Sequence, residues 1–130
     1  METNRVLKYS IYLIVSLISL NVFSQTSESN KKRFKDFYNL TGISKAEVSL
    51  FKEDNYKSVD EYEKLIELMQ CSKVVIAKFI PKTEVVFYNS SNSGTYNIYF
   101  SETFKYFKID GRTFVISKKK SKEISKILSQ

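Results

Sequence analysis

The feature that most constrains the fold is residues 73–117, where apolar and polar residues alternate in short segments separated by turn-forming residues. Alternation with a period of two places successive side chains on opposite faces of a β-strand. Together with the turn chemistry between the segments, this pattern predicts an antiparallel β-meander. Its five expected strands are residues 73–80, 83–89, 95–100 and 103–109 and the run that begins at Arg112.

Asp110-Gly111 is the clearest turn in this stretch, because Asp-Gly favours a type I′ hairpin in which glycine accepts a positive φ. The turn fixes the register, with Phe107 opposite Phe114 and Lys105 opposite Ile116. Ile109 should then face Arg112. The expected core face therefore carries Phe107, Ile109, Phe114 and Ile116. If Ser101 and Glu102 form a two-residue loop, the same face also carries Tyr96, Ile98 and Phe100.

The opposite face of the expected sheet combines aromatic and polar residues. Its members are Asn97, Tyr99, Phe104, Tyr106, Lys108, Thr113 and Val115. One interpretation is that a helix or a second copy of the chain covers part of this face. The other is an exposed platform that binds a sugar, a peptide or a protein. The candidate partner-binding residues are Tyr99, Phe104, Tyr106 and Lys108.

The N-terminal 24 residues have the organisation of a secretory signal peptide. Arg5 and Lys8 supply a positive region, the 13 residues 11–23 are mostly apolar, and Ser24 is small enough to precede a cleavage site. A membrane-spanning helix usually needs ~20 apolar residues, so we expect cleavage rather than a permanent anchor. The junction after Ser24 resembles signal-peptide ends in some AT-rich Gram-negative bacteria. We therefore expect an exported protein, periplasmic or secreted.

The remainder is long enough for one domain with a modest core. We expect residues 25–30 to be a disordered spacer and residues 31–130 to form a single small domain. Cys71 is the only cysteine, so an internal disulfide is impossible. We expect Cys71 to be a small buried residue at a helix end, with an intermolecular disulfide as the alternative.

Three helices are expected around the sheet. Phe34, Phe37 and Tyr38 share one helical face in residues 31–40, where Asn30 could cap the start and Gly42 the end. Ser58 and Glu61 have the spacing of a capping box for a helix to Cys71. The apolar stripe of that central helix is Tyr62, Leu65, Ile66 and Met69. A C-terminal helix should place Ile124, Ile127 and Leu128 on one face.

Residues 46–52 are ambiguous between helix and strand, and their alternation favours a strand. The expected fold is therefore α+β: an antiparallel five- to six-stranded meander packed against a central helix, with short N- and C-terminal helices. This order of elements resembles small exported bacterial domains in which one helix packs on a curved antiparallel sheet. The resemblance is architectural and implies no functional residue.

Most catalytic and metal-binding chemistry lacks the necessary residues. The chain has no histidine, which is the commonest general base and a common metal ligand. It has three glycines and no glycine-rich phosphate loop. The carboxylates at Asp60, Glu61, Glu63 and Glu67 are typical of a solvated helical face. We therefore expect no enzymatic activity, no cofactor and no metal, although a hydrolase that uses only carboxylates or lysine stays open.

The charge is unevenly distributed along a chain whose formal net charge is +7. Residues 31–35 carry four bases, residues 118–126 carry five lysines, and the acids concentrate between residues 47 and 67. One interpretation is solubility and helix-end complementarity. The other is attraction to an anionic surface, with Lys118, Lys119, Lys120 and Lys122 as the candidate contacts. No recognised nucleic-acid motif is present, so no nucleic-acid partner is expected.

The leading functional hypothesis is a non-enzymatic binding or structural domain of the cell envelope or extracellular space. Its expected partner is a protein or an envelope polymer. Membrane contact is expected only through an uncleaved N-terminal segment. One alternative is an inhibitor or immunity-type protein that acts on a secreted enzyme or toxin. Another is an adhesin that binds anionic surfaces through the lysines near residue 120.

Overall fold

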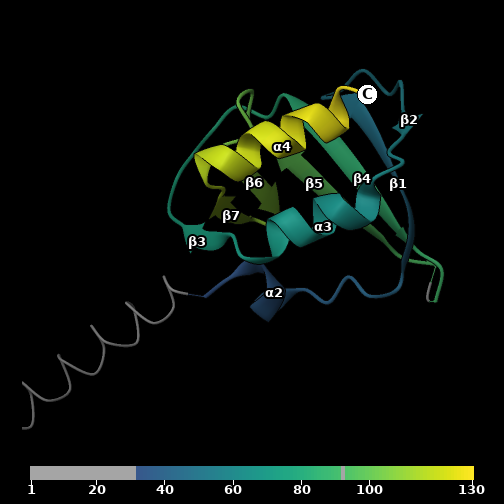
Figure 1. Ribbon diagram of the computed structural model, residues 1–130, viewed down its shortest axis with the longest axis horizontal. Coiled ribbons are helices and arrows are strands. Elements are labelled where there is room, and N and C mark those ends of the chain that lie inside the picture. Colours follow the sequence, from purple (N-terminus) through teal and green to yellow (C-terminus); the bar gives the residue numbers. More distant parts are fainter. Residues whose placement is uncertain (1–31, 92) are drawn as a thin grey trace, which may run out of the picture. The chain divides into compact units, whose positions relative to one another are not determined.

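The computed structural model describes residues 32–91 and 93–130 (Figure 1). The predicted signal peptide and spacer therefore lie outside the described residues. Residues 32–130 form one compact unit, which agrees with the expected small α+β domain. Its elements are α2 (Phe34–Phe37), β1 (Ile43–Leu50), β2 (Lys57–Ser58), α3 (Tyr62–Gln70), β3 (Lys73–Val75), β4 (Thr83–Asn89), β5 (Thr95–Phe100), β6 (Tyr106–Ile109), β7 (Arg112–Val115) and α4 (Lys118–Leu128).

The sheet has seven strands in the order β2-β1-β4-β5-β6-β7-β3, and every neighbouring pair is antiparallel. The predicted five- to six-stranded meander is therefore wrong in detail, because the continuous meander consists of the four strands β4 to β7. The strand predicted at residues 73–80 ends at Val75 and pairs with β7 rather than β4. Residues 76–82 then connect one edge of the sheet to β4. The ambiguous segment near Ala46 is a strand, as predicted.

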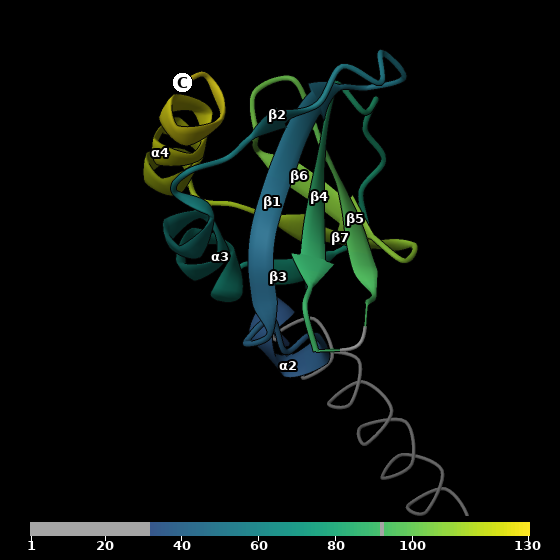
Figure 2. The same cartoon turned by 90° about the vertical axis from the view of Figure 1, so that its right-hand side faces the viewer.

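Two helices, rather than the single central helix predicted, cover one face of the sheet. Figure 2 shows α3 and α4 side by side on the same side of the strands. The physical reason is width: seven strands spaced ~4.8 Å apart span ~30 Å, whereas a helix is ~10 Å across. Leu65 and Met69 of α3 and Ile124 of α4 are all fully buried against this face. We call it the helix-side face.

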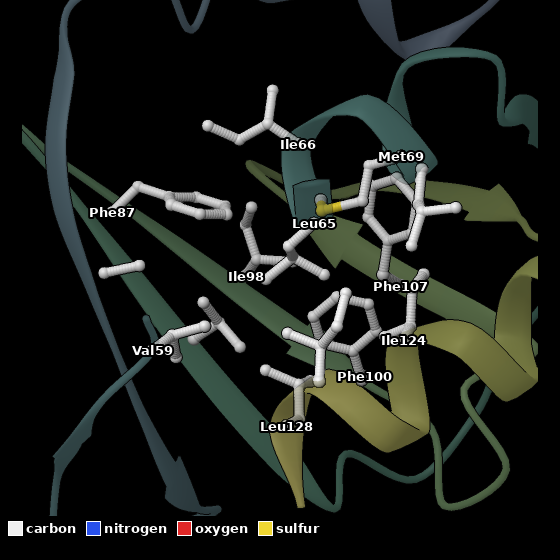
Figure 3. Close-up of a cluster of buried hydrophobic side chains, with 14 of the residues drawn as sticks. Val59, Leu65, Ile66, Met69, Phe87, Ile98, Phe100, Phe107, Ile124 and Leu128 are labelled. Atoms are coloured by element: carbon white, nitrogen blue, oxygen red, sulfur yellow. The ribbon is translucent and has the colours of Figure 1, made fainter. Parts of the chain in front are cut away.

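The core on the helix-side face is largely aromatic. The Phe34 ring of α2 meets the Phe107 and Phe114 rings edge-on, with centroids 5.2 and 5.3 Å away. Phe107 and Phe114 are themselves stacked at 5.1 Å. Figure 3 shows side chains from the sheet and both long helices converging on one cluster. All the residues predicted to face the core are buried except Tyr96, which packs against the cluster while half-exposed.

The β6–β7 hairpin has the predicted register. Phe107 pairs with Phe114 and Ile109 with Arg112, while the N–H of Ile116 donates to the carbonyl of Lys105 at 2.8 Å. Asp110 and Gly111 have φ angles of 49° and 80°, as a type I′ turn requires. Local turn chemistry therefore determines this pairing.

The β5–β6 connection differs from the predicted two-residue loop. Phe100 pairs with Phe107, and the N–H of Ser101 donates to the carbonyl of Tyr106, which leaves residues 102–105 as the turn. A four-residue loop has the same parity as a two-residue loop, so the faces predicted for Ile98 and Phe100 are still correct. Within the turn, however, Phe104 adopts a φ of 60° and no longer follows the strand alternation.

The predicted capping box at Ser58 and Glu61 is wrong. Ser58 lies in β2, opposite Glu47, and the N–H of Val59 donates to the carbonyl of Ala46 at 2.9 Å. These strand contacts hold the backbone extended, so α3 begins only at Tyr62 and its N-cap makes no side-chain hydrogen bond.

The helix ends give mixed results. Helix α2 ends at Phe37, so Gly42 is not its cap, and the proposed cap at Asn30 lies outside the described residues. Cys71 follows α3 as predicted, but its side chain is exposed rather than buried. Helix α4 begins after Ser117, whose Oγ accepts the Lys120 N–H, and its predicted apolar face is buried. Elements defined by a local apolar stripe are therefore predicted better than their ends.

Candidate functional site

The candidate site is the face of the sheet opposite α3 and α4, which we call the outer face. Tyr99 on β5 pairs directly with Lys108 on β6, and Tyr106 is two residues from Lys108 on the same strand. Directly paired residues share a face with Cβ atoms ~5 Å apart, and residues i and i+2 of a strand share a face too. These three side chains therefore form a continuous patch. Both tyrosines are half-exposed and Lys108 is exposed.

Phe104 does not belong to this patch, although the sequence predicted it there. Its ring packs against Phe100 of the core with centroids 5.7 Å apart. Its carbonyl accepts the Ser121 hydroxyl of α4 at 2.8 Å. The turn that precedes β6 rotates Phe104 to the helix side, so it contributes to packing and not to the outer face.

A connecting segment crosses the outer face. Residues 76–82, which we call the strap, run on the side of the sheet away from α3 and α4 (Figure 2). The Phe79 ring stacks on Tyr106 with centroids 6.1 Å apart and planes 15° from parallel. The N–H of Lys82 donates to the carbonyl of Phe100 at 2.9 Å and ends the crossing. The outer face is thus partly covered by an extended segment of the same chain, rather than by the helix or second copy that one interpretation of the sequence predicted.

Exposure along the strap alternates with a period of two. Ala77, Phe79 and Pro81 are half-buried, as expected for side chains that point toward the sheet. The other four residues form an outward row that is exposed: Ile76, Lys78, Ile80 and Lys82. The strap therefore has the side-chain geometry of an extended strand, although it belongs to no strand in the described part of the chain.

Ile76 and Ile80 are the most exposed large apolar residues of the described part, at 101% and 86% of their reference areas. An exposure near 100% means that neighbouring groups hardly shield the side chain, so both isoleucines lie on a crest. Sequence reasoning missed them because residues 73–80 were interpreted as one paired strand. The sequence did carry a signal: Lys78 has the same parity as Ile76 and Ile80, so a charged residue shares their side of an extended segment.

Two further contacts involve the tyrosine rings of the outer face. The Phe51 ring meets Tyr99 edge-on at 5.6 Å. The Lys105 Nζ lies 5.3 Å from the Tyr106 ring centroid, a cation–π distance. Together with Phe79, these contacts hold both tyrosine rings in place while leaving part of each ring accessible.

Carboxylates on this side are fewer than lysines. Glu84 is paired with Tyr99 across β4 and β5, and it accepts a hydrogen bond from the Tyr56 hydroxyl at 3.1 Å. Burial, together with this hydrogen bond, raises the pKa of Tyr56. Tyr56 therefore stays protonated and donates to Glu84 at neutral pH.

The second predicted site, the lysines of α4, lies on the other side of the sheet. Lys118, Lys119 and Lys122 are exposed, whereas Lys120 is half-buried. Three of these lysines occupy the first turn of the helix, where the macrodipole disfavours positive charge. The α4 lysines and the outer face are thus separate surfaces that variants can distinguish.

A hollow of about 370 Å³ between β1 and the end of α4 is lined by Leu50, Phe104 and Leu128, among others. Two of its lining residues, Ser49 and Thr83, are both polar and buried. The Ser49 Oγ already donates to the Leu50 carbonyl and accepts the Asn55 N–H, and no buried side-chain N or O atom of the described residues lacks a partner. The hollow therefore offers a ligand little free buried polar chemistry.

Within residues 32–91 and 93–130, no group of three or more Cys, Asp or Glu side chains is close enough together to hold a metal ion. No helix in the same part of the chain is both long and apolar enough to cross a membrane.

No protein-family model, curated protein or solved structure matches this chain. The candidate site therefore rests on the contacts and exposures of this chain's own residues.

Proposed function

We propose that this protein is an exported, non-enzymatic binding domain that contacts a component of the cell envelope through its outer face. The observation that carries the proposal is the patch of Tyr99, Tyr106 and Lys108, which is partly open to solvent beside the exposed row of the strap. Tyrosines combine a large apolar surface with a hydrogen-bonding hydroxyl, which suits them to binding surfaces. The organisation of residues 1–24 supports export.

The patch is also mechanically suited to binding. Its residues lie on strands β5 and β6 in the middle of the sheet, where neighbours on both sides restrict backbone motion. Phe51 and Phe79 further restrict the two tyrosine rings. A rigid aromatic surface loses little conformational entropy on binding, so more of the contact energy is available for affinity.

The test is retention of native envelope components on the immobilised full chain. Tyr99→Ser combined with Tyr106→Ser should abolish the retention, because it removes both aromatic rings of the patch. Lys118→Ser combined with Lys119→Ser is the control on the α4 surface and should retain what the unmodified protein retains. Circular dichroism verifies that each variant is folded. Retention that is unchanged in the tyrosine variant, or lost only in the lysine variant, would reject the outer face.

A further inference from the structure

We propose that the component bound by the outer face is an anionic lipid bilayer, and that Ile76 and Ile80 of the strap insert into its interfacial layer. This inference rests on the proposed function, since it names the class of ligand for the same surface. It concerns the folded domain and adds a second membrane contact to any made by the N-terminal segment. The shape, chemistry and charge of the strap support this ligand.

The shape of the strap suits a fluid surface. Ile76 and Ile80 are exposed at 101% and 86%, so they project from the surface and do not line a groove. A folded partner would need a matching hollow for each projecting side chain. A bilayer interface needs none, because lipids rearrange around an inserted group.

The spacing of the outward row also matches a lipid interface. Successive outward residues of an extended segment are ~6.7 Å apart, so each isoleucine has a lysine next to it on the same side. Lysine can lay its aliphatic stem along an apolar layer while its ammonium group stays among the phosphates. Ile76 and Ile80 can therefore insert without drawing the charges of Lys78 and Lys82 into hydrocarbon.

The charge around the strap favours anionic headgroups. Exposed lysines surround it on the outer face and its margins: Lys73, Lys78, Lys82, Lys105 and Lys108. The carboxylates on this face and its margins are Glu84, which is engaged by Tyr56, Glu47, which is paired with Lys45, Asp54 near Tyr56, and Glu102 in the β5–β6 turn. The exposed lysines outnumber them. This excess attracts anionic lipid. It also disfavours a second copy of this chain, because two straps facing each other would bring lysines together.

Tyr99 and Tyr106 fit the same orientation. Each presents an apolar ring and a polar hydroxyl, the combination that is enriched where membrane meets water. The stacking of Phe79 on Tyr106 fixes the strap over this surface, so the outward isoleucines and lysines of the strap lie on the same side of the sheet as the two tyrosines.

The test uses two singly labelled chains, which carry a polarity-sensitive fluorophore on opposite sides of the sheet. Cys71 is exposed at the end of α3 and labels the helix side without any substitution. A Cys71→Ser, Ile80→Cys chain carries the same label on the strap. The probes are vesicles of phosphatidylcholine with one quarter phosphatidylglycerol, and vesicles of phosphatidylcholine alone. The full chain is used throughout, so any contribution of residues 1–31 is the same in every comparison.

The expected result is a blue-shifted, brighter strap label on the anionic vesicles, with a much smaller change at Cys71. In the strap-labelled chain, Ile76→Ser should raise the lipid concentration for half-maximal signal by roughly tenfold, the cost of one lost isoleucine. Lys78→Glu with Lys82→Glu should remove the response. Lys118→Glu with Lys119→Glu makes the same charge change on the helix side and should leave most of the fluorescence response.

Several outcomes would overturn the inference. One is a strap label that does not respond, or responds no more than Cys71. Another is an equal response to neutral vesicles, which would reject the anionic class. A third is a fluorescence response that is lost in the Lys118→Glu, Lys119→Glu chain but kept in the Lys78→Glu, Lys82→Glu chain. Finally, envelope retention that depends on Tyr99 and Tyr106 without any vesicle response would preserve the proposed function and identify a protein or polymer as the ligand instead.

Discussion

The two faces of the sheet are covered in different ways, and the covers determine what each face exposes. The helix-side face lies under α3 and α4, which turn Leu65, Met69 and Ile124 inward together. The outer face lies under an extended strap, which turns Phe79 inward and therefore must turn Ile80 outward. A helix can place all its apolar residues on one side, whereas an extended segment exposes every second residue. Ile76 and Ile80 are thus exposed because an extended segment, and not a helix, covers the outer face.

The largest expected difference between the faces comes from one substitution made on each. Ile66→Asp should unfold the domain, because it places a charge in the buried layer between α3 and the sheet at a cost of several kcal/mol. Ile76→Asp makes the same chemical change on the strap and should leave the domain folded. Circular dichroism with thermal melting measures both. Two folded variants would contradict the burial of α3.

Truncating a side chain of the sheet should cost more stability on the helix-side face than on the outer face. Phe107→Ala removes a fully buried ring that contacts Phe34, Phe100 and Phe114. We expect a loss of about 3–5 kcal/mol in the free energy of unfolding. Tyr99→Ala removes a half-exposed ring on the outer face and should cost about 1 kcal/mol. Urea titration followed by tyrosine fluorescence gives both values, and equal losses would remove the distinction.

The attachment of the strap should have a smaller effect. Phe79→Ala removes the stacking on Tyr106, which we expect to cost about 1 kcal/mol of stability. It should also speed amide hydrogen exchange at Lys82, whose N–H donates to Phe100. Exchange at Val86, in the middle of the sheet, serves as the internal control. Slow exchange at Lys82 in the variant would mean that Phe79 does not hold the strap.

Alkaline pH offers a test of the contacts of Tyr38 on the helix side. Burial raises the pKa of Tyr38; the Arg112 hydrogen bond opposes this shift and the Asp110 hydrogen bond adds to it. The folded protein therefore holds this proton more tightly than the unfolded chain. The resulting stability is complete below the unfolded pKa of about 10 and is lost as pH rises through the folded pKa. Tyr38→Phe should lose less stability than the unmodified protein between pH 9 and 11, by urea titration.

The smallest expected effect is on the strap's exposed row. Ile76→Ser with Ile80→Ser should change the free energy of unfolding by no more than about 0.5 kcal/mol, since both side chains are already in water. The variant should bind less of an apolar dye such as ANS. A clear loss of stability would show that these side chains are packed.

Local rules predicted the parts of the fold in which neighbours in sequence are neighbours in space. Asp110-Gly111 fixed the pairing of Phe107 with Phe114, and strand parity then assigned Tyr99 and Lys108 to the outer face. Pairings between distant segments are not encoded in a local pattern, so the β3–β7 pair was missed. For the same reason the strand contacts of Ser58 displaced the predicted capping box.

The strap shows a further limit of sequence periodicity. Alternation indicates an extended backbone but does not indicate whether that backbone is hydrogen-bonded to a neighbour. Residues 73–75 and 76–82 have the same type of pattern, yet only the first group forms a strand. The candidate site was therefore half predicted: its tyrosines followed from parity, and its isoleucines required the tertiary structure.

The most direct test of the account is thiol labelling along the strap. Single cysteines at positions 76–82, each with Cys71→Ser, report the exposure of every residue through the rate of reaction with a small maleimide. The account predicts alternating rates, fast at positions 76, 78, 80 and 82 and slow at 77, 79 and 81. Uniformly fast labelling would mean that the strap does not rest on the outer face, and would contradict the difference between the two faces.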